Sequence, residues 1–185
     1  MQEIETFYPQ NIAAWRDWLE KHHQSHDSIW VVFYKKSSGE PTITWSEAVD
    51  MALCFGWIDS KKVSVDAVQS IQFFSKRKAK STWSKINKDK IEKLIEAKLM
   101  APAGIESIRI AKENGSWTML DEVEALVIPS DLKESLQSVE GLLEKFEGLS
   151  KSAKKEMLFK MLSAKRPETR QKRIEEIVTL LQKGK

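Results

Sequence analysis

The segment TWSEAVDMALCFGWIDSKKVSVDAVQSIQFF, residues 44–74, carries the clearest structural signals of the chain. It opens with the spacing of a capping box, because the Thr44 oxygen can accept a free backbone N–H while Glu47 reaches back to the cap. This predicts a helix that runs to about Phe55 and whose apolar end is buried. Gly56 stands where a helix ends in a left-handed residue, and Trp57 would fold back over that end as a hydrophobic contact.

After this turn the pattern changes from helix to strand. Residues 62–65 alternate between polar and apolar, and residues 70–74 nearly do, with DAVQ between them. Alternation on both sides of a short connection predicts a β-hairpin. Upstream, IWVVFY at 29–34 is rich in β-branched and aromatic residues, which predicts a fully buried strand. Together these segments predict a small mixed sheet.

Helices are expected around this sheet. Residues 11–23 place apolar side chains at helical spacing, which predicts an amphipathic helix. Asn87 is expected to cap a helix that carries Ile91 and Leu94 on its apolar face. The segment APAG at 101–104 should end that helix, and a short helix should follow over 105–114.

Beyond residue 115 the pattern predicts helices alone, after Pro129 and over 142–146, 152–163 and 167–182. We therefore expect an α+β fold in two parts. A body at 1–115 is expected to hold the aromatic core, since all seven tryptophans lie in the first two thirds of the chain. A helical C-terminal subdomain at 116–185 is expected to pack on the body without a flexible linker.

Composition narrows the class of protein. With 185 residues, 41% apolar and 31% charged, the chain fits a soluble globular protein, and no apolar run reaches the roughly 20 residues of a membrane span. The start MQEIETFYPQ lacks the pattern of a signal peptide, so we expect a cytoplasmic protein. The single cysteine, Cys54, excludes an internal disulfide and is expected to be buried and inert.

Charge is segregated along the chain. Residues 116–150 carry eight acids and two bases, residues 151–185 carry eleven bases and four acids, and residues 76–90 carry seven bases and one acid. One interpretation is a solvated basic face beside a complementary acidic one. The alternative is an anion site on the last predicted helix, where Arg166, Arg170 and Arg173 share one stripe near the positive end of the helix dipole. Lys165 would join Arg166 at the start of this helix.

Other candidates for chemistry are few. Asp59 and Ser60 follow the packed turn and could orient a ligand, or could simply form a turn bonded to its own backbone. His22 and His26 have the spacing of a helical metal pair, but the third ligand and the glutamate of a hydrolase are missing, so no metal site is expected. No nucleotide-binding glycine motif and no nucleophile elbow occurs, and we expect no cofactor.

Four segments resemble the YdeI/OmpD-associated family, also called the bacteriocin-protection family, in the order that the family shows. They are EAVDMALCFGWIDS (47–60), RKAKSTWSKIN (77–87), KLMAPAG (98–104) and SAKRPETRQKRIEEIVTLL (163–181). The resemblance spans residues 30–184. It implies a small bacterial protein linked by name to protection against bacteriocins or antimicrobial peptides and to an outer-membrane porin, with no catalytic residues to assign.

One departure from the family lies at 72–84, where the relatives commonly have a proline and an additional arginine and this chain has neither. Lysine keeps the charge but lacks the bidentate fork of arginine, which weakens the case for a geometrically demanding anion site there.

Three functions remain open. The first is a non-enzymatic binding or regulatory protein that holds an anionic small molecule or an acidic protein partner, with the candidate residues Arg77, Lys78, Lys80, Trp83, Lys165, Arg166, Arg170 and Arg173. The second is sequence-tolerant nucleic-acid binding, with bases stacked on Phe73, Phe74 and Trp83. The third is an unrecognised enzyme centred on Asp59 and Ser60. Nucleic-acid binding would show the steeper dependence on salt.

Overall fold

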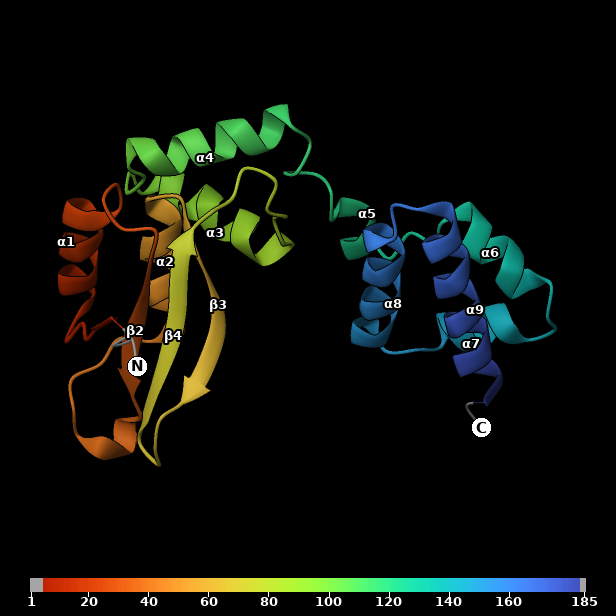
Figure 1. Ribbon diagram of the computed structural model, residues 1–185, viewed down its shortest axis with the longest axis horizontal. Coiled ribbons are helices and arrows are strands. Elements are labelled where there is room, and N and C mark those ends of the chain that lie inside the picture. Colours follow the sequence, from red (N-terminus) through yellow and green to blue (C-terminus); the bar gives the residue numbers. More distant parts are fainter. Residues whose placement is uncertain (1–4, 184–185) are drawn as a thin grey trace. The chain divides into compact units, whose positions relative to one another are not determined.

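The computed structural model describes residues 5–183 and divides into two compact units, with the boundary between Thr118 and Met119. The first unit, the body, contains a four-stranded mixed sheet with helices, and the second is helical (Figure 1). The expected α+β fold class is confirmed. The expectation that the helical subdomain packs on the body stays a prediction.

In the body the elements are β1 (Thr6–Phe7), α1 (Ile12–His22), β2 (Ser28–Tyr34), the 3-10 turn η1 (Lys36–Ser38), α2 (Trp45–Cys54), β3 (Trp57–Ser64), β4 (Gln69–Lys76), α3 (Lys85–Glu96) and α4 (Pro102–Glu113). In the second unit they are α5 (Asp121–Glu124), α6 (Ser130–Gln137), α7 (Leu142–Glu147), α8 (Lys151–Ser163) and α9 (Pro167–Lys183).

The sheet has the order β1-β2-β4-β3, in which β1 and β2 are parallel and the other pairs antiparallel. Buried strand residues such as Val31 and Phe74 share one core cluster with residues of α1 and α2. The helix α2 lies behind the sheet in Figure 1. The core of the body therefore forms between one sheet face and these helices. Trp15 of α1 is fully buried there, and its indole N–H donates to the Ala48 carbonyl of α2 at 3.0 Å.

The strand β2 is predicted to be fully buried, and this prediction is wrong at Trp30, Phe33 and Tyr34, which are half-buried. Ile29 and Val31 are buried against the core, whereas Trp30 and Tyr34 are only half-buried. These two side chains point to the sheet face opposite the core, where Trp30 packs on Phe73 of the neighbouring strand with ring centroids 5.1 Å apart.

The helix–turn–hairpin at 44–74 is confirmed, with longer strands than the pattern indicated. The capping box of Thr44 and Glu47 is present, and Gly56 adopts the left-handed conformation with φ +73°. Because this one glycine redirects the chain, Trp57 already pairs with Lys76 at the start of β3. Asp59 and Ser60 therefore lie within a strand, beside a bulge, and do not form the turn considered above.

Two helix boundaries differ from the sequence-based expectation. The N-cap of α3 is Ser84, whose hydroxyl accepts the Asn87 N–H at 3.3 Å, so Asn87 lies in the first turn and is not the cap. The segment APAG was expected to break a helix, but α3 has already ended at Glu96 and Pro102 begins α4. Proline suits a first-turn position because its missing N–H would have no partner there.

The start of α4 packs closely on the end of α2. A Cβ at Gly104 would lie 2.2 Å from the Cys54 carbonyl oxygen, so only glycine fits this crossing. The Ala101 N–H donates to the same carbonyl at 3.0 Å. Cys54 itself is fully buried, as expected.

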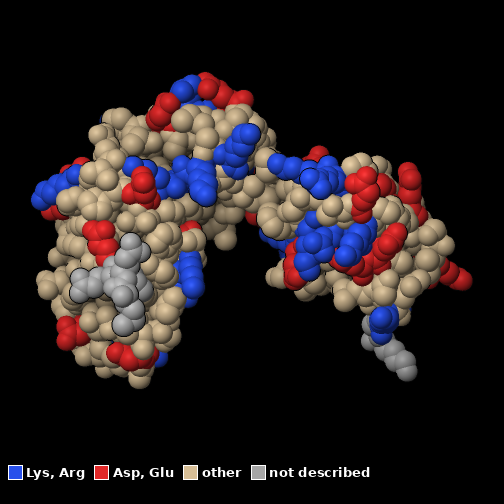
Figure 2. Space-filling view, viewed as in Figure 1, with Lys and Arg blue, Asp and Glu red and all other residues tan. Residues whose placement is uncertain are grey.

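The second unit has its own apolar core, which includes Leu132, Phe146, Leu158 and Ile174. The predicted helices at 130, 142–146, 152–163 and 167–182 are confirmed, and the short helix α5 was not foreseen. Figure 2 shows acidic and basic side chains next to one another on the visible face of this unit. No helix among residues 5–183 has the length and apolar character needed to cross a membrane.

Candidate functional site

The main candidate site is a cavity of about 460 Å³ in the body, which we call the aromatic cavity. Five segments that are distant in sequence line it: the end of α1, the α2–β3 turn, the end of β4 with the following loop, the residue Trp83 and one side of α4. Its apolar wall includes Phe55, Trp57, Trp83 and Ile110. The turn around Gly56 is therefore both a helix terminus and a cavity wall.

Arg77 is held against this wall by three contacts. Its backbone N–H donates to the Gly56 carbonyl at 2.9 Å, and its Nη1 donates to the Thr82 carbonyl at 3.1 Å. The guanidinium carbon lies 3.6 Å from the centre of the Trp83 ring, which is a close cation–π stack. Trp83 is 2% exposed, so the platform under the guanidinium is rigid.

The Arg77 charge is not balanced by an ion pair within the described part of the chain. Among residues 5–183 no carboxylate forms an ion pair with it. Burial lowers the pKa of Arg77 to about 10, and the charge of Asp59 opposes this shift. The side chain thus stays cationic at neutral pH in a setting that disfavours the charge.

Two buried donors next to the cavity lack partners in the described part of the chain. They are Nε of Arg77 and Nε1 of Trp57, a residue that is 0% exposed. A buried N–H without an acceptor costs about 1–3 kcal/mol. Because both residues line the aromatic cavity, the desolvation cost is concentrated at one wall.

The other polar groups of the cavity are partly engaged. Lys76 pairs with Asp27 at 3.0 Å and donates to the Gln24 carbonyl at 2.8 Å. The Nδ1 of His23 lies 2.8 Å from the Leu19 carbonyl, which can only accept, so Nδ1 carries the proton and Nε2 is left for other contacts. Lys78 is exposed and lines the cavity.

Asp59 and Ser60 do not form a reactive pair. The Asp59 carboxylate accepts the Trp45 indole N–H at 2.8 Å and the Gln72 amide at 3.0 Å. The carbonyl of Ser60 accepts from the same Gln72 amide, while its side chain is exposed on the strand. These contacts make Asp59 a positioning group for Trp45.

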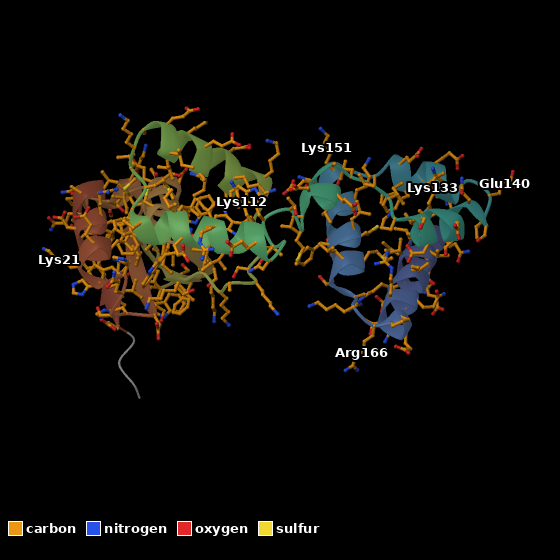
Figure 3. All side chains as sticks on the ribbon, turned by 90° about the horizontal axis from the view of Figure 1, so that it is seen from above. Lys21, Lys112, Lys133, Glu140, Lys151 and Arg166 are labelled. Carbon is orange, nitrogen blue, oxygen red and sulfur yellow. The ribbon has the colours of Figure 1, made fainter. Side chains whose placement is uncertain are left out.

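The arginine stripe lies in the second unit and is largely occupied by carboxylates of that unit. Arg170 of α9 holds Asp131 of α6 with both oxygens, at 2.5 and 3.0 Å, and Arg173 pairs with Glu176 at 2.6 Å. Lys165 and Arg166 are exposed, and Arg166 projects away from the helices in Figure 3. A binding role for the stripe stays a prediction.

The structure thus brings together Arg77, Lys78 and Trp83 and leaves the other candidates elsewhere. Lys80 follows them in sequence but is exposed and does not line the cavity. Phe74 and Trp83 are both buried, so neither ring can stack on a base as the nucleic-acid hypothesis requires. Among residues 5–183 no group of three or more metal-ligating side chains is present.

Sequence reasoning missed several groups at the cavity. The sequence patterns assign no role to His23, and they indicate only a hydrophobic contact for Trp57. Ser107 and Ile110 were assigned to a helix without a role. Their spacing on α4, three residues apart, does place them on one side, but nothing in the sequence indicates which wall that side meets.

Comparison with protein-family models gives two matches. Residues 7–107 match the model described as Domain of unknown function (DUF8412). Residues 125–184 match the model described as Bacteriocin-protection, YdeI or OmpD-Associated, which confirms the resemblance to that family. The first three of the four similar segments fall within the first match. Searches of curated proteins and of solved structures gave no match.

Proposed function

We propose that this chain, which belongs to the family described as Domain of unknown function (DUF8412), is a non-enzymatic binding protein. Its body would take up a small ligand that joins an anionic group to an apolar or aromatic part. The observation that carries this proposal is the Arg77 guanidinium, which lies in the wall of the aromatic cavity and forms no ion pair with a carboxylate of residues 5–183.

The chemistry of the wall fits such a ligand. A cation removed from water is costly unless an anion joins it, and a guanidinium fork suits the two oxygens of a carboxylate or phosphate. Ala103, in the first turn of α4, lines the cavity, and the positive end of this helix dipole adds to the attraction. The one carboxylate among the lining residues, Glu106 of the same helix, is paired with Arg109. The rings of Phe55 and Trp57 would contact the apolar part.

A thermal-shift measurement tests the proposal with phenyl phosphate, inorganic phosphate and benzyl alcohol as probes. Phenyl phosphate should raise the melting temperature most, because only it has both parts; at a hundredfold excess over its Kd the gain is about 2.7 kcal/mol. Arg77→Met should abolish the shift. Lys80→Met is the matched control and should keep it, because Lys80 lies in the same basic loop but outside the cavity.

Two outcomes would refute this function. An equal loss in both variants would show that bulk positive charge attracts the probe. The absence of a shift with phenyl phosphate in the unchanged protein, over a range up to millimolar concentrations, would leave Arg77 a purely structural cation.

The biological setting is a further part of the proposal. The printed description of the family matched by residues 125–184 supports one part of this proposal, a role in protection against bacteriocins. The other parts are that the protein is bacterial and cytoplasmic and that the second unit would contact an acidic partner or a porin-associated one. Deleting the gene should then increase sensitivity to a bacteriocin. Complementation with the unchanged chain should restore resistance, and unchanged sensitivity after deletion would contradict this role.

A further inference from the structure

A second cavity, of about 420 Å³, lies at the other end of the β3–β4 hairpin. Its walls come from the end of β2 and the following loop, the start of α2, and the facing ends of β3 and β4. Lys35, Lys36 and Lys62 line it, so we call it the lysine cavity. It shares no lining residue with the aromatic cavity.

Trp45 is the unusual residue of this cavity. It is 52% exposed although it is large and apolar, and it lines the cavity from the first turn of α2. Its indole N–H donates to Asp59, and the same carboxylate oxygen accepts from Gln72, a polar side chain that is 5% exposed. A buried amide and a carboxylate thus hold an exposed ring in a fixed orientation.

The charged side chains that line the lysine cavity are those of its three lysines. None of the three lysines forms an ion pair with a carboxylate of residues 5–183. The nearby acid Glu47 is occupied in the capping box, where the Thr44 hydroxyl lowers its pKa. Asp66 accepts the N–H groups of Val68 and Gln69 in the hairpin turn. The positive end of the α2 dipole adds to the field.

We infer that the lysine cavity binds a nucleotide, with the base stacked on the Trp45 ring and the phosphate held by the lysines. The volume lies in the range of small-ligand sites, and stacking on a fixed aromatic ring accepts every base because each has a flat π-face. The nucleotide can be free or the end of a single strand, since both present the same ring and phosphate. This site is independent of the proposed function.

Calorimetric titration of the full chain with AMP tests the inference. Trp45→Ala should weaken AMP binding by about tenfold or more, because stacking on the ring is lost. Lys62→Gln should weaken it about threefold or more. Lys61→Gln is the matched control and should have no effect, because Lys61 is the exposed neighbour of Lys62 on β3 and does not line the cavity. This lysine pair tests the site even if Trp45→Ala fails to fold.

Further ligands test the contributions of the base and of the phosphate, and they distinguish a free nucleotide from the end of a strand. Adenosine and ribose 5-phosphate should each bind more weakly than AMP, since each lacks one part. An oligonucleotide of eight adenosines that binds more tightly and with a steeper salt dependence indicates a strand end, and equal affinity indicates the free nucleotide. Ribose 5-phosphate binding as tightly as AMP, equal effects of the two lysine variants, or no AMP binding to the unchanged chain would each overturn the inference.

Discussion

At the scale of single residues, burial controls the chemistry of the only thiol. Cys54 is 0% exposed at the end of α2, where its carbonyl also accepts the Ala101 N–H. Burial raises the pKa of Cys54, and the neighbouring Arg16 cation offsets only part of that shift. The thiol therefore stays protonated near neutral pH and lies out of reach of solvent, which is the opposite of a reactive cysteine.

This leads to a labelling prediction. At pH 8 a thiol reagent should modify native Cys54 about a hundredfold more slowly than the urea-unfolded chain, because labelling requires opening of the body. Above about pH 8.5 the unfolded thiol ionises while the folded one does not, so the free energy of unfolding should fall as pH rises further. Rapid modification of the native protein would disprove the buried assignment.

Trp57 and Trp45 provide a matched pair of indoles. Trp57 is fully buried beside Gly56, so Trp57→Ala should lower the free energy of unfolding by about 3–5 kcal/mol. Trp45 is largely exposed, and Trp45→Ala should cost about 1 kcal/mol or less. Urea unfolding of both variants measures the difference. Wild-type stability in Trp57→Ala would mean that the residue does not pack the turn as described.

At the scale of elements, the bidentate contact between Arg170 and Asp131 joins α9 to α6. Hydrogen bonds from Arg170 lower the pKa of Asp131. The stability that this pair contributes is therefore present above pH 4, near the unfolded pKa of about 3.9, and is lost as pH falls through the lower folded pKa. A second cross-pair, Lys155 with Glu124, joins α8 to α5.

A charge-removal experiment follows from this contact. The side chains of both arginine–carboxylate pairs are about a third exposed or more, and solvent screens such pairs. The double variant Arg170→Gln with Arg173→Gln should therefore change the free energy of unfolding by under about 1 kcal/mol. Asp131→Asn should reduce the loss of stability between pH 4 and pH 2, measured by urea unfolding at each pH. The control Lys151→Gln should leave the acid dependence as it is. A loss of several kcal/mol in the arginine variant would show that the stripe is a structural core.

Local rules predicted elements from the sequence, although the cap rule misplaced the start of α3, whose N-cap is Ser84 and not Asn87. Thr44 and Glu47 are three residues apart, so the capping box could be recognised, and Gly56 could be recognised as a helix terminus. The role of Asp59 could not, because its partners Trp45 and Gln72 are 14 and 13 positions away. The role of Arg77 could not be predicted either. In the sequence it resembles Lys78 and Lys80, and its burial follows only from the pairing of β4 with β3.

At the scale of the whole molecule, the chain has two separate cores. One contains Trp15, Leu53 and Phe74 of the body, and the other contains Leu136, Phe146 and Met161 of the second unit. A unit with its own apolar core can in principle fold by itself. The smaller unit buries less surface, so it should be the less stable of the two.

We therefore predict that fragments 1–118 and 119–185 each fold when expressed alone. Circular dichroism should show cooperative thermal unfolding of both fragments, at a lower temperature for 119–185. A full set of dispersed amide signals in NMR would distinguish a packed core from a loose helical state. A fragment that remains unfolded would show that the boundary after Thr118 does not separate independent folding units.

Every tryptophan lies at or before residue 117, so the second unit contributes almost nothing to tryptophan fluorescence or near-ultraviolet absorbance. Both tyrosines, Tyr8 and Tyr34, also lie in the body. Excitation at the indole band therefore reports on the body alone, while far-ultraviolet ellipticity reports on the helices of both units. Unfolding curves from the two signals will coincide if the units melt together and diverge if they melt separately, without any introduced dye.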